Sequence, residues 1–189
     1  MNHRLACVLG SLVVGAIVFV PEPAAGQHGP SYPLPSWDQT LRATKRFVLV
    51  MPIDGFGPQA VLDRETGLVW QRTPIEPRAF EWHEARRLCR TENTGGRQGW
   101  RLPSVEELSS LLDLSPTSPD PGLPSGHPFE LREITPVFWS ASVDDFDASH
   151  GYGVIFVGEQ PDVVPGVRVF PKNFNLRAWC VRGGQGDHP

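Results

Sequence analysis

The sequence of 189 residues has few cysteines, no excess of positive charge and no motif of a common enzyme class. Its three cysteines are too few for a scaffold held by several disulfides. Lys and Arg total 17 against 21 Asp and Glu, a net charge of −4, so nucleic-acid binding by phosphate neutralisation is not expected. Glycine-rich phosphate loops, nucleophile elbows and Cys-x-x-Cys pairs are missing. The hydrophobic content of 40% nevertheless suffices for a folded core.

The most apolar stretch lies near the N-terminus, at residues 5–20. It follows His3 and Arg4 and precedes the small residues 24–26. A basic start, a short apolar stretch and small residues before a cleavage point are typical of a secretory signal peptide. The apolar stretch is shorter than the ~20 residues that span a bilayer, although a single anchoring helix is the alternative. We therefore expect residues 1–26 to be a signal peptide, and the mature protein to be secreted or periplasmic without a membrane span.

Removal of the signal peptide would take away Cys7 and leave Cys89 and Cys180. In an oxidising compartment, two cysteines most simply form one disulfide. Two buried free thiols are the alternative. A bridge here would close a loop of about 90 residues, which chain-entropy models value at roughly 4–5 kcal/mol.

Proline and glycine are abundant, at 20 and 19 residues. Prolines at 30, 33 and 35 indicate that residues 27–45 are a Pro-rich arm or linker. The prolines between 117 and 128 predict a long irregular loop. The remaining residues, 46–185, are expected to form one domain.

Local patterns within that domain predict an α+β fold. Apolar runs between turn residues predict strands at 47–51, 60–62, 68–71, 137–141, 154–157, 167–170 and 178–182. Residues 81–91 predict a helix, because Trp82, Ala85 and Cys89 recur on one face. Arginines at 86, 87 and 90 occupy its other face. A solvated helix face is the commoner explanation of such arginines, and a binding patch is the alternative.

A second helix is predicted after Pro103. Ser104 and Glu107 have the spacing of a capping box, in which each residue's side chain binds the other's backbone N–H. Leucines at 108, 111 and 112 give this helix an apolar stripe, and we expect it to end at the Ser-Pro pair at 115–116.

Five segments in this order resemble one known family. Residues 63–71 (DRETGLVWQ) are similar to its D-x-x-T-G-L-x-W hairpin, and residues 82–89 to its W-x-x-A-x-x-x-C helix. Residues 99–108 (GWRLPSVEEL) are similar to its W-R-L-P-[ST]-x-x-E-L signature. Residues 139–142 (WSAS) and 179–182 (WCVR) resemble its last two motifs. The chain thus resembles, over about residues 58–183, the Lcl C-terminal domain family of secreted bacterial proteins.

The resemblance implies a C-type-lectin-like fold, with two helices packed on short antiparallel strands and long loops. In that fold a cysteine on the first helix pairs with one on the last strand, and Cys89 and Cys180 occupy matching places. The family's name-giving member is a collagen-like adhesin whose C-terminal part is implicated in binding sulfated polysaccharides. This chain has no Gly-X-Y repeat, and its net negative charge does not favour a polyanionic ligand.

The implied fold also suggests a calcium site. Gln160 and Asp162 flank a proline in the tripeptide QPD, the galactose-type calcium motif of C-type lectins. Their amide and carboxylate oxygens could bind Ca²⁺ and sugar hydroxyls together. Asn173 and Asn175 are the nearest substitutes for the missing partner strand. A polar turn is the commoner explanation of such a tripeptide, so we expect no cofactor, with Ca²⁺ as the alternative.

The family's signature residues are expected to be structural. Four tryptophans lie on predicted regular elements and are expected in the core rather than as platforms for sugars: Trp70, Trp100, Trp139 and Trp179. We expect Arg101 to be largely buried and bonded to backbone carbonyls, and Glu107, which belongs to the same signature, to be structural as well.

The expected function is that of a non-enzymatic recognition module that binds a glycan or a protein at the cell envelope. The long loops at 113–135 and 158–175 would carry the binding surface. This expectation depends on fold analogy. A structural subunit of an envelope complex is an alternative. An enzyme of the formylglycine-generating type, which shares the broader fold, is a weaker one, because a disulfide would leave it no free active-site thiol.

Overall fold

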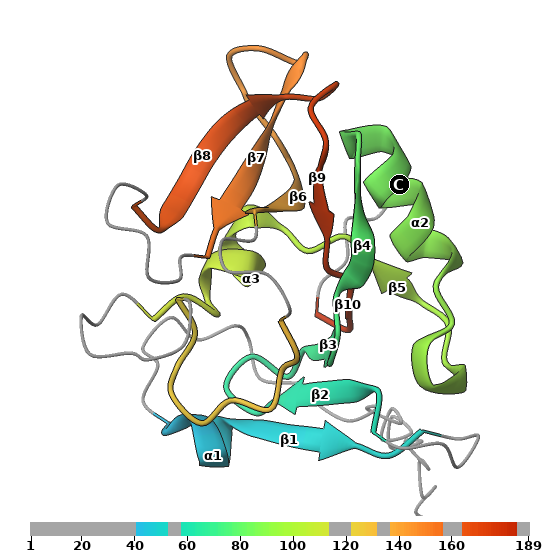
Figure 1. Ribbon diagram of the computed structural model, residues 1–189, viewed down its shortest axis with the longest axis vertical. Coiled ribbons are helices and arrows are strands. Elements are labelled where there is room, and N and C mark those ends of the chain that lie inside the picture. The colour runs from blue at the N-terminus through green and yellow to red at the C-terminus, as the bar shows by residue number, and fades with distance from the viewer. Residues whose placement is uncertain (1–40, 53–57, 114–121, 132–136, 157–163, 185–189) are drawn as a thin grey trace, which may run out of the picture. The chain divides into compact units, whose positions relative to one another are not determined.

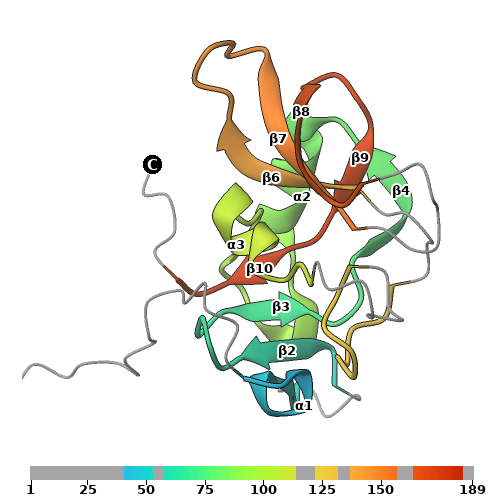
Figure 2. The same cartoon turned by 90° about the vertical axis from the view of Figure 1, so that its left-hand side faces the viewer.

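The computed structural model describes residues 41–52, 58–113, 122–131, 137–156 and 164–184. All of them lie in one of the chain's two units, Tyr32–Pro189. They form two five-stranded sheets and three α-helices (Figures 1 and 2). The expected signal peptide at 1–26 and most of the expected arm lie outside these residues. No helix in the described part of the chain is long and apolar enough to cross a bilayer.

The first sheet is antiparallel and has the strand order β1-β2-β3-β10-β5. Its strands are β1 (Phe47–Val50), β2 (Ala60–Asp63), β3 (Val69–Gln71), β10 (Val181–Arg182) and β5 (Trp100–Arg101). The predicted hairpin joins β2 to β3, and its turn contains Gly67 at φ 70°, a conformation that favours glycine. The last strand of the chain lies between β3 and β5.

The second sheet has the order β4-β9-β6-β7-β8. Its strands are β4 (Ile75–Phe80), β9 (Leu176–Ala178), β6 (Val137–Val143), β7 (His150–Ile155) and β8 (Gly166–Pro171). The pairing of β6 with β9 is parallel and the others are antiparallel. Antiparallel strands were expected throughout, so this pair departs from the prediction.

The helices are α1 (Ala43–Arg46), which spans the expected boundary between arm and domain, α2 (Trp82–Thr91) and α3 (Val105–Ser109). A single turn of 3₁₀ helix, η1 (Thr94–Gly96), follows α2. The predicted capping box of α3 is confirmed, because Ser104 Oγ accepts from Glu107 N at 3.2 Å and Glu107 Oε2 accepts from Ser104 N at 2.9 Å. The helix ends earlier than expected, but the leucines at 111 and 112 remain buried in the turns that follow.

The first sheet separates two clusters of buried side chains. Alternate residues of a strand point to opposite faces, so Val61 packs in the first cluster and Ala60 in the second. Trp179 lies at the centre of the first cluster. Its ring centroid is 5.0–5.9 Å from the rings of Trp70, Phe129, Phe138 and Phe156. The α+β class is therefore confirmed, with a core on each face of the sheet.

Three details of the strand prediction were wrong. The expected closing strand at 178–182 is two strands, β9 and β10, because the chain changes sheet at Trp179 and Cys180. Neither β4 nor β5 was expected; β4 contains a proline, which is disfavoured inside strands, and β5 has only two residues. β7 begins at His150, four residues before the strand expected at 154–157. Two glycines interrupt its apolar pattern, and a Cβ on one of them, Gly153, would lie 3.0 Å from the Phe170 ring.

Candidate functional site

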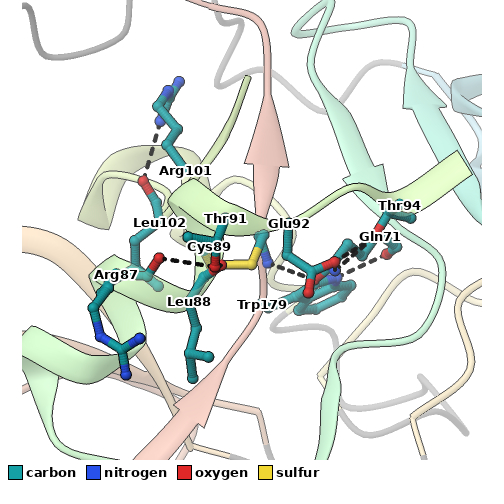
Figure 3. The surroundings of a disulfide bond; sticks show 11 residues. Gln71, Arg87, Leu88, Cys89, Thr91, Glu92, Thr94, Arg101, Leu102 and Trp179 are labelled. Carbon is teal, nitrogen blue, oxygen red and sulfur yellow. Dashed lines mark hydrogen bonds between the residues drawn. A yellow bond between two sulfur atoms is a disulfide. The ribbon is translucent and has the colours of Figure 1, made fainter. Parts of the chain in front are cut away.

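The two cysteines form a disulfide that connects α2 to the chain between β9 and β10 (Figure 3). The S–S distance is 2.00 Å and the Cα atoms are 5.4 Å apart. Cys89 and Cys180 are both fully buried. Their pairing confirms the expected bridge, and neither sulfur is a free thiol in this structure.

Gln71 holds the backbone next to this disulfide. Its Nε2 donates to Glu92 at 3.0 Å and Thr94 at 2.9 Å, and its Oε1 accepts from the backbone N–H of Cys180 at 3.0 Å (Figure 3). Its backbone carbonyl accepts from the indole N–H of Trp179 at 2.8 Å. This buried amide therefore ties β3, the end of α2 and the final strands together.

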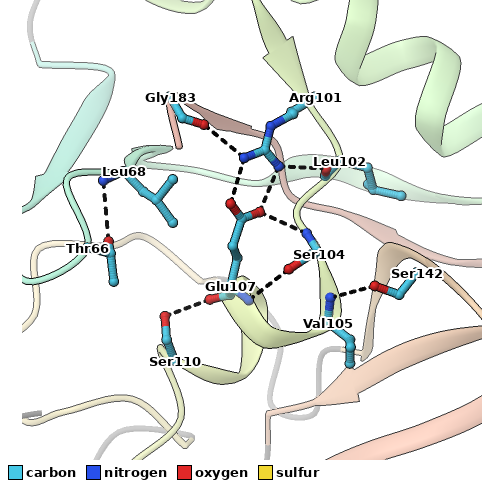
Figure 4. A network of polar contacts seen from close by, with 10 residues as sticks. All are labelled: Thr66, Leu68, Arg101, Leu102, Ser104, Val105, Glu107, Ser110, Ser142 and Gly183. Carbon is cyan, nitrogen blue, oxygen red and sulfur yellow. Dashed lines mark hydrogen bonds and ion pairs between the residues drawn. The ribbon is translucent and has the colours of Figure 1, made fainter. Parts of the chain in front are cut away.

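The signature residues Arg101 and Glu107 form a two-pronged ion pair (Figure 4). The guanidinium donates to both carboxylate oxygens, at 2.7 and 2.6 Å, and the side chains are 22% and 8% exposed. Arg101 also donates to the carbonyls of Leu102 at 3.3 Å and Gly183 at 2.8 Å. The expected carbonyl contacts are present, but the main partner is a carboxylate that the sequence did not indicate.

The four signature tryptophans are in the core, as predicted. Trp70, Trp139 and Trp179 have no exposed surface, and Trp100 is 2% exposed. Rings without exposed surface cannot act as sugar platforms, so these motif residues contribute to the core of the fold.

One surface depression lies where three segments meet, and five of its seven lining residues have polar side chains. We call it the polar hollow. Its volume is about 500 Å³, and it is lined by Glu81, His83, Ala148, Ser149, Pro171, Lys172 and Asn173. These residues come from the start of α2, from the loop between β6 and β7, and from the turn between β8 and β9. The three segments are near one another in the upper part of Figure 1.

Lys172 connects these three segments through hydrogen bonds. Its backbone N–H donates to Ser149 O at 2.9 Å, its Nζ donates to Ala148 O at 2.6 Å, and its carbonyl accepts from Trp82 N at 3.0 Å. The ammonium also lies 4.3 Å from the centroid of the Trp82 ring, and the Arg86 guanidinium lies 4.6 Å from the same ring. The base of the hollow is therefore fixed by both backbone and cation–π contacts.

Two aromatic side chains project from the loops that bound the polar hollow. Phe146, in the loop between β6 and β7, is 98% exposed, and Phe174, in the turn between β8 and β9, is 50% exposed. Neither residue was predicted from the sequence to belong to a site. The signal that could have found them is a phenylalanine between charged or amide side chains in a loop, where burial in the core is not required.

Asp147, Ser149 and His150 bring together the residue types of a hydrolytic triad. Ser149 Oγ donates to Asp147 at 2.7 Å, whereas His150 places the same nitrogen, Nδ1, 3.0 Å from Ser149 Oγ and 2.8 Å from Asp147. An activated serine must donate to a histidine whose other nitrogen meets the carboxylate. This arrangement is a hydrogen-bonded loop instead.

Two groups of this loop region have shifted pKa values. The Ser149 hydroxyl and backbone N–H lower the pKa of Asp147. Partial burial and nearby carboxylates raise the pKa of Tyr152.

The calcium candidates are only partly described. Gln160 and Asp162 lie outside the described residues. Asn173 and Asn175 are exposed in the turn between β8 and β9, and Asn173 lines the polar hollow. Among the described residues, no three His, Cys, Asp or Glu side chains are grouped closely enough to share a metal ion.

Comparison with known families is consistent with the motifs. The family model of the Lcl C-terminal domain matches residues 59–182, about two thirds of the chain, and the chain belongs to this family. No curated protein and no solved structure matches the chain. The observed architecture is thus a mixed α+β domain with two sheets, and the C-type-lectin-like fold stays a prediction.

Proposed function

We propose that this domain is a non-enzymatic recognition module that binds a glycan at the bacterial cell envelope through the polar hollow. The observation that carries the proposal is the combination of hydrogen-bonding side chains in the hollow with two exposed phenylalanines on the loops around it. Exposed aromatic side chains beside a concave polar surface indicate a binding site.

The groups in the hollow match the chemistry of a sugar. Each sugar hydroxyl donates and accepts hydrogen bonds, and the hollow offers both kinds of partner. Glu81 accepts, the Lys172 ammonium donates, and Ser149 and Asn173 can do both. The C–H faces of a pyranose ring are apolar, so they can pack on Phe174 or Phe146. Neutral sugars fit this mixture better than polyanions, since the hollow contains a carboxylate.

The location also supports the proposal. The disulfide is typical of an oxidising compartment, and the expected signal peptide would direct the chain there. An enzyme of the formylglycine-generating type is disfavoured, because both cysteine sulfurs are in the disulfide.

A glycan array probed with the secreted protein tests the proposal, once with calcium and once with a chelator. Binding is expected, and Phe174→Ser should weaken it at least tenfold. The matched control is Val167→Ser, which removes an apolar side chain that is 38% exposed on β8, outside the hollow. The control should bind as the wild type does.

Each outcome decides between the alternatives. Binding that survives chelation removes calcium from the proposal, whereas binding lost with calcium would implicate Gln160, Asp162 and the two asparagines. An absence of binding across the array would overturn glycan recognition and favour a protein partner. For such a partner, β8 is an edge strand of the second sheet whose Val167 and Val169 are exposed.

A further inference from the structure

A second concave surface lies on the first sheet, and it shares no residue with the polar hollow. We call it the sheet groove. Its volume is about 220 Å³. Its floor consists of aliphatic side chains on one face of adjacent strands: Val50, Ala60, Leu62 and Val69. The side chains on the opposite face of these strands, such as Val61, are buried in the first core cluster.

The wall of the sheet groove is the turn that follows α2. Gly95 has φ 65°, and a Cβ there would lie 3.6 Å from Pro52, so this turn packs directly against Pro52. Its N–H donates to Gln59 Oε1 at 2.9 Å, and Thr94 accepts from Gln71 at 2.9 Å. These bonds fix the wall against the sheet, so the groove is formed before any partner arrives.

Among the described residues that line this groove, the ionisable ones are Arg97 and Arg182. Neither is ion-paired with a carboxylate in the described part of the chain, and the Nε of Arg97 is buried without a hydrogen-bond partner. A carboxylate from a ligand in the groove would pair with the positive charge of these two guanidinium groups.

The positive charge continues beyond the groove. A Cβ on Gly99 would lie 3.7 Å from Arg182 Nε, and Gly99 lines a neighbouring hollow of about 190 Å³. Arg86 and Arg90 of α2 line the same hollow. The arginine face of α2 is thus adjacent to an apolar groove. From the sequence, this face had two possible interpretations, a solvated helix face or a binding patch.

We propose that the sheet groove docks an extended acidic polypeptide segment that inserts one large apolar side chain. A cavity of about 150 Å³ holds a benzene ring, so the groove accepts one side chain of the size of leucine or phenylalanine. Carboxylates on either side of that side chain pair with Arg97 and Arg182. An aliphatic floor without amide or carboxylate groups does not suit a sugar, and charge complementarity favours an acidic peptide.

Fluorescence anisotropy with two nine-residue peptides tests the proposal on the purified protein. Both peptides consist of Asp and Glu around a central residue, which is leucine in one and serine in the other. The leucine peptide should bind, more weakly as salt increases, and the serine peptide should bind at least tenfold more weakly. The double variant Arg97→Gln/Arg182→Gln should reduce affinity for the leucine peptide at least tenfold.

Two matched controls accompany this variant. Arg168→Gln removes an exposed arginine of β8 that does not line the groove, and Phe174→Ser alters the polar hollow; neither should change peptide binding. Equal circular dichroism and melting temperature of all variants would show that they fold. The two proposals are therefore tested separately. Peptide binding can be lost while glycan binding persists, and glycan binding can be lost while peptide binding persists.

Several results would overturn the proposal. Equal affinity for the two peptides would show attraction by charge without docking of a side chain. Equal affinity of the arginine double variant and the wild-type protein for the leucine peptide would place the site elsewhere. Light scattering that shows a dimer lost in the arginine variant would assign the groove to a second copy of the chain. Residues 53–57, which follow Pro52, lie outside the described residues. If the leucine peptide bound only to a variant in which these five residues are replaced by glycine and serine, the native groove would be closed to partners.

Discussion

The disulfide offers the most quantitative test of the structure, through the variant Cys89→Ala/Cys180→Ala. The two residues are 91 positions apart. The chain-entropy relation for a loop of that length gives about 4.6 kcal/mol at 25 °C. Because a domain of this size shifts its melting temperature by roughly 2–4 °C per kcal/mol, the variant should melt about 9–18 °C lower than the oxidised protein.

Urea denaturation followed by tryptophan fluorescence would measure this loss of unfolding free energy. Reduction of the wild-type protein is the matched control, because it opens the loop without removing the sulfur atoms. The two single variants should each lose nearly as much as the double variant, since either change breaks the bridge. Additive single losses, or a total loss below about 1 kcal/mol, would refute the reasoning.

Two further predictions concern single hydrogen-bonded groups. Glu107→Gln should lower the unfolding free energy by about 1.5–3 kcal/mol, because it leaves the Arg101 guanidinium without its charged partner while glutamine still fits the capping box. Glu106→Gln changes an exposed neighbour and should lower the unfolding free energy only slightly. Equal losses of unfolding free energy in the two variants would contradict the ion pair. NMR titration should place the pKa of Asp147 below its ordinary value of 3.8. Its lowered pKa stabilises the fold above that ordinary value, and this contribution disappears as the pH falls through the folded-state pKa. Ser149→Ala should raise the pKa towards 3.8, and an unchanged value would contradict the assigned cause.

Features set by near neighbours in the chain were predictable from the sequence. The capping box depends on Ser104 and Glu107, three residues apart, and the buried stripe of α2 depends on one helical period. The pairing of the cysteines was predictable because the expected signal peptide would leave two of them, and because of the family resemblance.

Features that depend on distant segments were not predictable. β5 has two residues and exists because β10 supplies its partner. The polar hollow joins Glu81, Ser149 and Lys172, which no spacing in the sequence connects. Arg97 and Arg182 belong to different motifs, and only the folded sheet brings them to one groove. Exposure can also be unpredictable from the sequence. The hydrophobicity of Phe146 alone would have placed this residue in the core, but its side chain is exposed.

The positions of the last two strands affect how the chain can be made. β10 lies between β3 and β5, and β9 lies between β4 and β6, so residues 176–182 complete both sheets. A nascent chain that ends before Leu176 leaves β5 and β4 without these neighbours and lacks Cys180 as a partner for Cys89. Folding that depends on such long-range pairing is slow. Neither sheet nor the disulfide can therefore be completed until residues 176–182 have been synthesised, and a chain truncated before Leu176 should not reach the native fold.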